Sequence, residues 1–165
     1  RRNIVMLIAK RAEGSELMNK MYKEYGCPEN AIEGDPNERC ILCRLCSYAC
    51  EEMGTSAISA IMRGTEKRIA TPYDEASAAC IGCGSCAEIC PTGAIEMKQT
   101  GNQRIIWDKT FELVTCSNCG KPFATSEELK YVAAKTGIDN DIKLCDSCRK
   151  RELANKLSQF SVEFE

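Results

Sequence analysis

The sequence contains no histidine, and only 6% of its residues are aromatic. Without histidine the chain lacks the side chain used most often for general acid–base catalysis and the commonest nitrogen ligand of metals. It also lacks an excess of basic residues: 22 Lys and Arg against 24 Asp and Glu give a net charge of -2. Nucleic acid and anionic membranes attract strongly basic proteins, so neither is expected as the main partner.

Long apolar runs are missing as well. No stretch approaches the roughly 20 apolar residues of a membrane span. Arg1 and Arg2 precede an apolar run, as in a twin-arginine signal, but that run covers only Ile4 to Ala9 and ends in Lys10. The apolar region of a signal peptide needs roughly 7–15 residues. We therefore expect a cytoplasmic protein with no secretory signal and no membrane span.

Motifs for bond chemistry are absent too. No glycine-rich nucleotide fingerprint follows a strand, and no nucleophile is paired with a base. What the sequence has instead is cysteine: 13 in 165 residues. A chain so poor in large aromatic side chains needs disulfides or metals to hold its fold. Because the cysteines come in tight C-x-x-C steps, we expect metal-bound thiolates in a reducing compartment.

The cysteine pattern is repeated. CILCRLCSYAC begins at Cys40 and CIGCGSCAEIC begins at Cys80, each with the spacing C-x2-C-x2-C-x3-C. Each run is followed by an Ala-Ile pair, at Ala57 in the first copy and Ala94 in the second. The chain is therefore expected to contain a duplicated unit with pseudo-twofold symmetry.

This spacing is typical of two [4Fe–4S] clusters, in which the fourth cysteine of each run binds the other cluster. Zinc would instead call for C-x2-C pairs separated by a finger-length loop. The predicted ligands are, for cluster I, Cys40, Cys43, Cys46 and Cys90, and for cluster II, Cys80, Cys83, Cys86 and Cys50.

The two runs differ at corresponding positions. Gly82 and Gly84 in the second run permit left-handed backbone angles and close approach of a cluster, whereas the first run has Leu42 and Arg44 there. Arg44 is interpreted as a solvated surface charge; the alternative is a cation that raises the potential of cluster I. Cys50 is followed by glutamate, whereas the second run ends in Cys-Pro.

A second cysteine set has the spacing C-x2-C-x25-C-x2-C, and its members are Cys116, Cys119, Cys145 and Cys148. Two such knuckles are typical of a closed, structural four-thiolate zinc site. The same four thiolates could hold a third [4Fe–4S] cluster, and a redox-active dithiol is the remaining alternative. Cys27 belongs to neither set and is expected to be a small buried residue or a thiol without a ligand role.

Secondary structure outside the cysteine runs is predicted from periodicity and capping signals. The segment before Cys40 is expected to be helical and interrupted at Gly14. A hairpin is expected around Asp108-Lys109, and the capping-box pattern of Thr125 with Glu128 marks the start of a helix. A second helical stretch is predicted over RELANKL, and the tail QFSVEFE could be an edge strand or a docking peptide.

The predicted fold class is α+β, with three parts. Residues 1–37 form a helical N-terminal extension, 38–98 a duplicated bacterial-type dicluster ferredoxin core, and 99–165 a hairpin with a four-cysteine metal-knuckle module and tail.

Residues 38–98 carry a family resemblance, through CILCRLCSYACEE, IATPYDE and CIGCGSCAEICPTGAI. They resemble the dicluster domain of the large iron–sulfur subunit of respiratory complex I, of the diaphorase small subunit of NAD-reducing hydrogenases, and of iron-only hydrogenases. The helical segment before them is similar to one that, in those families, carries a cluster held by one histidine and three cysteines. This chain has no histidine there, so that cluster is expected to be absent. The four-cysteine tail resembles the knuckles appended to some hydrogenase ferredoxin-like subunits.

The resulting functional prediction is a non-catalytic electron-transfer subunit of a stable hetero-oligomeric oxidoreductase. Its partner could be a hydrogenase, a flavin-NADH subunit, or a tungsten- or molybdenum-pterin enzyme such as an aryl-CoA reductase. The alternative is a free ferredoxin-like carrier, but such a carrier would present a strongly acidic docking face, and the near-neutral net charge argues against one. A regulatory or nucleic-acid module is disfavoured, because short charge runs are usually solvated faces.

Overall fold

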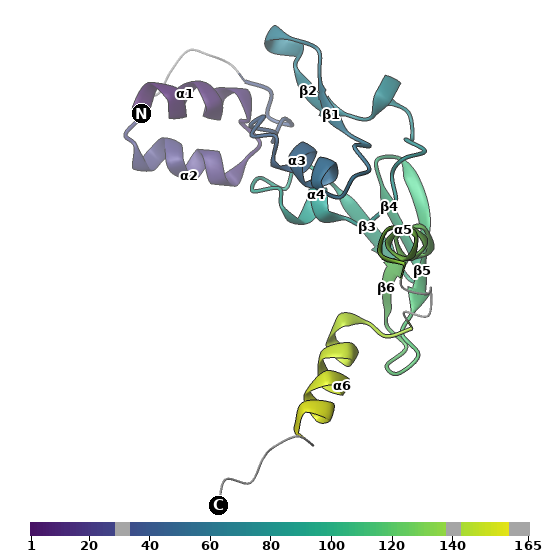
Figure 1. Ribbon diagram of the computed structural model, residues 1–165. Coiled ribbons are helices and arrows are strands. Elements are labelled where there is room, and N and C mark those ends of the chain that lie inside the picture. Colours follow the sequence, from purple (N-terminus) through teal and green to yellow (C-terminus); the bar gives the residue numbers. More distant parts are fainter. Residues whose placement is uncertain (29–33, 138–142, 159–165) are drawn as a thin grey trace, which may run out of the picture. The chain divides into compact units, whose positions relative to one another are not determined.

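The computed structural model describes residues 1–28, 34–137 and 143–158 (Figure 1). The described chain mixes helices with short strands and divides into two compact units. The first comprises Arg1–Cys80, Gly84–Met97 and Ile106–Asp108, and the second comprises Ile81–Cys83, Lys98–Ile105 and Lys109–Glu165. The tail predicted as a strand or docking peptide falls outside the described residues, and among the described helices none is long and apolar enough to cross a membrane.

The N-terminal segment forms two helices, as predicted. They are α1 (Arg2–Arg11) and α2 (Glu16–Glu24), and the chain turns between them around Gly14. Ser15 caps α2, because its hydroxyl accepts a hydrogen bond from the Met18 amide. The two helices pack against each other through a small apolar core of Val5, Ala9, Ala12 and Met18 (Figure 1).

The cysteine runs each lead into a short helix. These are α3 (Leu45–Glu52) after the first loop and α4 (Ser85–Glu88) after the second, and the two helices pack together. In the sequence, the segment between these two helices contains strands β1 (Ser59–Ile61) and β2 (Arg68–Ala70), which pair antiparallel. Two single-turn helices follow the strands, η1 (Gly64–Glu66) and η2 (Pro72–Asp74).

The C-terminal part is built on a four-stranded sheet with the order β3-β4-β5-β6. Its strands are β3 (Met97–Thr100), β4 (Gln103–Ile106), β5 (Lys109–Thr115) and β6 (Pro122–Thr125). Burial alternates along β4 and β5, which places Arg104, Phe111 and Leu113 on the covered face. Two helices complete this part, α5 (Ser126–Thr136) and α6 (Asp146–Ser158).

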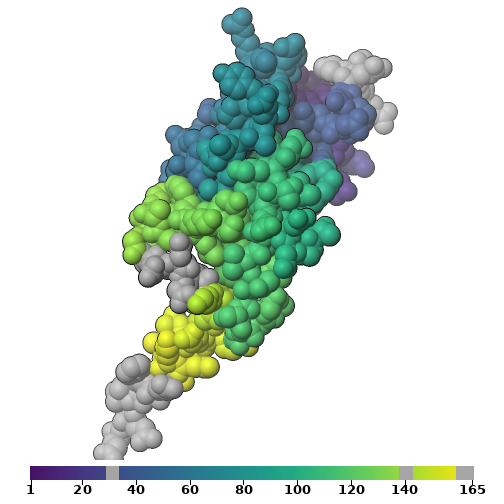
Figure 2. All heavy atoms as spheres, turned by 90° about the vertical axis from the view of Figure 1, so that its right-hand side faces the viewer, coloured from purple at the N-terminus to yellow at the C-terminus, as the bar shows by residue number. Residues whose placement is uncertain are grey.

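Two local predictions for this part are confirmed. The hairpin turns at Trp107 and Asp108, both with positive φ (52° and 55°), which is the twist that a two-residue turn between antiparallel strands needs. Thr125 caps α5 by accepting a hydrogen bond from the Glu128 amide at 3.0 Å. Helix α5 packs against β5 and β6, and its light-green spheres lie beside those of the strands in Figure 2.

Candidate metal centres

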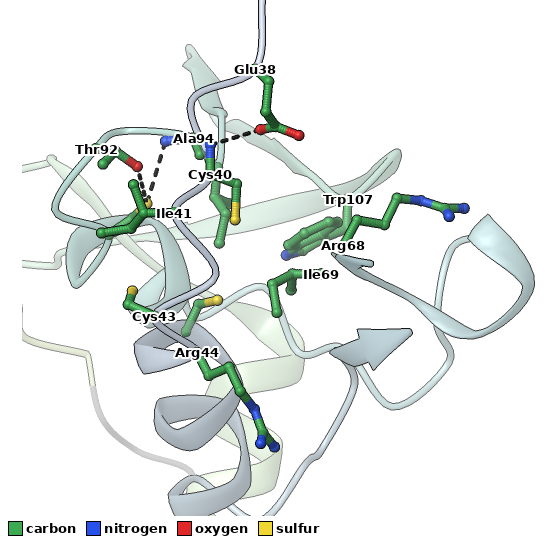
Figure 3. A pocket seen from close by; sticks show the side chains of 13 residues that line it. Glu38, Cys40, Ile41, Cys43, Arg44, Arg68, Ile69, Thr92, Ala94 and Trp107 are labelled. Atoms are coloured by element: carbon green, nitrogen blue, oxygen red, sulfur yellow. Dashed lines mark hydrogen bonds between the residues drawn. The ribbon is translucent and has the colours of Figure 1, made fainter. Parts of the chain in front are cut away.

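Four of the predicted ligands surround one cavity. Cys40, Cys43 and Cys46 of the first run line a space of about 190 Å³ together with Cys90, the last cysteine of the second run (Figure 3). A single water needs roughly 10–15 Å³ measured in the same way, so the cavity holds a body of many atoms. Four thiols around such a space fit the donor set of a [4Fe–4S] cluster.

The rest of this cavity wall is mixed in character. Ile41, Ile69 and the Trp107 ring give it apolar surface, and Arg44 and Arg68 stand at its edge (Figure 3). The carboxylate of Glu38 accepts a hydrogen bond from the Cys40 amide at 2.7 Å and so fixes the start of the loop. Apolar walls and charges of this kind are among the features that set cluster potentials.

The thiols around the cavity differ in acidity. Burial raises the pKa of Cys40 and of Cys46, so both favour the neutral thiol in the metal-free protein. Burial also acts to raise the pKa of Cys90, but hydrogen bonds from Thr92, Ala94 and Ile95 outweigh it and the pKa is lowered. A metal cluster bound here would have to displace protons from these thiols, and the lowered pKa of Cys90 makes its proton easier to remove than those of Cys40 and Cys46.

The last cysteines of the two runs share one hydrogen-bonding arrangement. Cys50 Sγ accepts from the Ala57 amide at 3.2 Å and lies 3.2 Å from the Thr55 hydroxyl. Cys90 Sγ accepts from the Ala94 amide at 3.3 Å and lies 3.6 Å from the Thr92 hydroxyl. The alanines are those of the two repeated Ala-Ile pairs. The arrangement places a backbone N–H on each sulfur, a contact that tunes cluster potentials, and the duplication of the two runs stays a prediction.

The two loops also share backbone angles. Gly82 and Gly84 have φ of 70° and 82°, and the corresponding Leu42 and Arg44 have φ of 55° and 66°. Glycine adopts this conformation at no steric cost, whereas a side chain with a Cβ is strained there by roughly 1–2 kcal/mol. Arg44 is exposed, and its guanidinium lies 5.1 Å from the centre of the Tyr48 ring, in line with its interpretation as a surface charge.

The members of the second predicted ligand set lie on different elements of the chain. Cys50 lies on α3 and Cys86 on α4, and Cys80 begins the second loop. The Trp107 Nε1 donates a hydrogen bond to Cys86 Sγ at 3.4 Å. Cys83 belongs to the C-terminal unit with its neighbours Ile81 and Gly82. That these four sulfurs bind one cluster stays a prediction.

The C-terminal cysteines come close together. The four sulfurs of Cys116, Cys119, Cys145 and Cys148 all lie within 4.8 Å of one another, and the Cys119 and Cys145 sulfurs are 3.7 Å apart. All but Cys119 are buried. The Cys145 amide donates to Cys116 Sγ at 3.3 Å and lowers the pKa of Cys116 to about 6, whereas a hydrogen bond with the Cys145 thiol raises the pKa of Cys148 to about 12.

The distances between the four sulfurs distinguish a single metal ion from a [4Fe–4S] cluster at this group. Four thiolates at about 2.3 Å from a tetrahedral zinc ion lie about 3.8 Å from one another. A [4Fe–4S] cube holds its ligand sulfurs about 6 Å apart, because irons and sulfides stand between them. The observed spacing therefore fits a single tetrahedral ion.

Cys27 belongs to none of these groups. It packs against the core of α1 and α2, and its thiol lies 3.6 Å from the Arg2 carbonyl oxygen. This placement suits a small, partly buried side chain in a helical core.

Two side chains near the predicted ligands were not foreseen from the sequence. Trp107 lines the first cavity and donates to Cys86, and Arg104 donates to the backbone of the second cysteine loop. Trp107 is the single tryptophan of the chain and lies at a hairpin turn, where an exposed polar residue is more usual. That position could have drawn attention to it; Arg104 in an alternating strand gives no such signal.

Comparison with known families agrees with this interpretation of the cysteines. Residues 31–97 match a family described as "4Fe-4S dicluster domain", and residues 79–125 match a second family of the same description.

Curated relatives match over parts of the chain. A subunit of an NADH-quinone oxidoreductase from Rhizobium meliloti (strain 1021) is 32% identical over 83 residues, 50% of this chain and 10% of the relative. A subunit of an NADP-reducing hydrogenase from Solidesulfovibrio fructosivorans is 34% identical over 61 residues, 35% of this chain and 10% of the relative. A ferredoxin from Pyrobaculum islandicum is 40% identical over 37 residues, 22% of this chain and 35% of the relative.

The chain thus spans about a tenth of the length of the two oxidoreductase subunits that it matches. The matched region contains both cysteine runs, and the relatives are subunits of an NADH-quinone oxidoreductase and of a hydrogenase. Residues 31–125 of the chain therefore contain sequence of the 4Fe-4S dicluster type, and the chain is similar over part of its length to oxidoreductase subunits.

Proposed function

We propose that this chain relays single electrons between two [4Fe–4S] clusters, to or from a catalytic partner subunit. The ligands proposed for cluster I are Cys40, Cys43, Cys46 and Cys90, and those for cluster II are Cys80, Cys83, Cys86 and Cys50. The observation that supports this proposal most directly is that Cys90, from the second run, lines the same cavity as the three cysteines of the first run. Such crossed ligation is the rule for two-cluster ferredoxins.

When bound, the clusters supply one-electron transfer, and the chain supplies spacing, burial and electrostatics. Ile41, Ile69 and Trp107 give the first cavity apolar wall surface. The amides of Ala57 and Ala94 donate to the sulfurs of Cys50 and Cys90, and with clusters bound these hydrogen bonds would stabilise negative charge on the sulfurs.

An exposed edge beside the first cavity supports contact with a partner. Cys43 is exposed, and α3 next to it presents Leu45 and Tyr48 with 41% and 49% of their surface accessible. Exposed apolar side chains beside an exposed ligand suit a lasting subunit interface through which an electron passes. We propose a catalytic redox subunit as the partner, working in the cytoplasm, where thiols stay reduced.

At the C-terminal four-cysteine group we propose one structural Zn²⁺. Support comes from the sulfur spacing of 3.7 Å between Cys119 and Cys145, which suits one ion and is too small for a third cluster. Three of the four thiols are buried, as expected for a closed structural site.

Metal and sulfide analysis of the anaerobically purified chain tests both proposals. We expect about eight iron and eight sulfide per chain and about one zinc. A preparation without sulfide would overturn the electron-transfer proposal. About twelve iron without zinc would instead overturn the zinc assignment and favour a third cluster.

The native mass of the untagged protein from its own host tests the partner. A stable subunit should elute in a complex well above the mass of its own single polypeptide and co-purify with a catalytic subunit. A single polypeptide that elutes alone and carries both clusters would favour the free carrier.

A further inference from the structure

The short segment Ile81–Cys83 lies in the second cysteine run but packs with the C-terminal unit. Gly82 is at its centre and has a φ of 70°. The Phe111 ring occupies the place of a side chain there: a Cβ built on Gly82 would be 2.7 Å from two ring carbons. Phe111 is 1% exposed, so the ring is fixed in the core while it covers this backbone.

Polar side chains of the same unit bind three successive carbonyls of this segment. Arg104 Nη1 donates to the Gly82 oxygen at 2.8 Å and to the Cys83 oxygen at 3.3 Å. Thr125 Oγ1 donates to the Ile81 oxygen at 2.5 Å. Both side chains are buried, with 8% and 0% of their surface exposed. Burial of a guanidinium is costly without partners, and these carbonyls supply part of them.

The three contacting residues come from three adjacent strands. Arg104 lies on β4, Phe111 on β5, and Thr125 ends β6. Strands β5 and β6 pair antiparallel, with Leu113 opposite Thr125. We call Arg104, Phe111 and Thr125 the clamp.

The knuckle Cys116–Cys119 forms the turn of this same hairpin. The Cys116 amide donates to the Lys121 oxygen at 2.9 Å, and the Gly120 amide donates to the Cys116 oxygen at 2.8 Å. Cys145 and Cys148 at the start of α6 complete the group of four. A metal ion bound by the group would therefore tie together the strands that carry Phe111 and Thr125.

We propose that the C-terminal module positions the loop of cluster II, and that metal at the four-cysteine site keeps the clamp closed on it. This inference rests on the proposed cluster assignment. Arg104, Phe111 and Thr125 act as positioning residues. The guanidinium on the Gly82 and Cys83 carbonyls also brings positive charge to this loop, which favours the reduced state of a cluster bound there.

Hydrogen–deuterium exchange of the purified, cluster-loaded protein tests the clamp directly. Thr125→Val removes the donor to the Ile81 oxygen, and with it the cap of α5, with little change of volume. Arg104→Gln removes the guanidinium that donates to the Gly82 and Cys83 oxygens. Each should speed amide exchange in a peptide covering 80–86 roughly three- to tenfold, because hydrogen bonds to the backbone of this segment are lost. A peptide covering 40–46 should not change. The matched control is Arg149→Gln, at an exposed position on α6.

A redox titration monitored by electron paramagnetic resonance separates positioning from general loosening. Arg104→Gln should make reduction of one cluster about tenfold harder, about 59 mV for one electron. Arg104→Lys keeps the charge and should restore most of that shift. A ligand variant, Cys86→Ser, identifies the signal of cluster II. Equal shifts of both clusters, or unchanged exchange in 80–86 for both clamp variants, would overturn the clamp.

A separate variant tests the role of the bound metal. Cys148→Ser should lower the zinc content and speed exchange in 80–86, while Cys27→Ser should change neither. If exchange in 80–86 responds to Arg104→Gln but not to loss of the metal, the coupling to the four-cysteine site is wrong. Absence of iron and sulfide in the wild type would instead sink the proposed function, and the same exchange measurement on that cluster-free protein would then test the contacts of Arg104 and Thr125 with the backbone of 81–83.

Discussion

The two cysteine loops share spacing and backbone angles, yet they are held by different scaffolds. In the first loop Ile41 packs against the helical core of α1 and α2. In the second loop Ile81, Gly82 and Cys83 are bound by side chains of the C-terminal sheet. Each loop begins with Cys-Ile, so the same motif is held by a helical core in one loop and by a sheet in the other.

The difference explains why one loop needs glycine where the other tolerates larger residues. Leu42 and Gly82 occupy corresponding left-handed positions. Phe111 lies against Gly82 and leaves no room for a Cβ, so glycine is required there by packing as well as by backbone angle. The left-handed angle alone costs a non-glycine residue only about 1–2 kcal/mol, which the first loop accepts at Leu42.

The largest effect should come from breaking the exchange of ligands between the loops. Cys50→Ala should remove the cluster held by the second loop, and Cys90→Ala the cluster held by the first, so each variant loses about four iron. Combining each with Cys86→Ser or Cys46→Ser shows which signal has gone. If Cys50→Ala abolishes the cluster of Cys40, Cys43 and Cys46 instead, each loop supplies all four of its own ligands.

A smaller effect is expected from adding one methyl group to the second loop. Gly82→Ala should lower the free energy of unfolding by about 2–4 kcal/mol, because strain in the left-handed region adds to overpacking against Phe111. Gly93→Ala is the matched control: Gly93 has a φ of 61° and open space around it, so only about 1 kcal/mol should be lost. Anaerobic denaturant titration measures both. Equal losses would show that Phe111 moves aside freely.

The sequence alone predicted the local elements well, because their signals are local. The cysteine spacing predicted the cluster family, Gly14 predicted the break between α1 and α2, and Thr125 with Glu128 predicted the cap of α5. These depend on residues a few positions apart, whose contacts follow from backbone geometry.

The side chains that hold the two cysteine loops in place could not be predicted in the same way. In RIIW nothing marks the charged residue as buried, yet Arg104 is only 8% exposed while the neighbouring Ile105 is 42% exposed. Arg104 is buried because it finds carbonyl acceptors more than twenty positions away in the sequence, at Gly82 and Cys83. A contact between residues so far apart in the sequence produces no periodic pattern from which it could be predicted.

A modest shift of potential should follow from the hydrogen bond that the Trp107 indole makes to Cys86. Trp107→Phe keeps an aromatic ring but loses the donor to sulfur. Loss of about 1 kcal/mol of stabilisation corresponds to roughly 40 mV for one electron, so the potential of cluster II should fall by that amount. Tyr73→Phe, at a side chain that is 94% exposed, is the control. If only the potential of cluster I shifted, Trp107 would act as part of the wall of the first cavity and not through its hydrogen bond to Cys86.

The smallest effect should come from making the first loop resemble the second at Arg44. Arg44→Gly relieves left-handed strain of roughly 1–2 kcal/mol. It also loses the contact with the Tyr48 ring, worth about 0.5–1 kcal/mol at an exposed site, and adds freedom to the unfolded chain. These contributions nearly cancel, so unfolding free energy should change by less than about 1 kcal/mol. Because solvent screens an exposed cation, the potential of cluster I should move by less than about 30 mV. A drop well beyond that, absent in Arg44→Lys, would make Arg44 the counterpart in the first loop of Arg104 in the second.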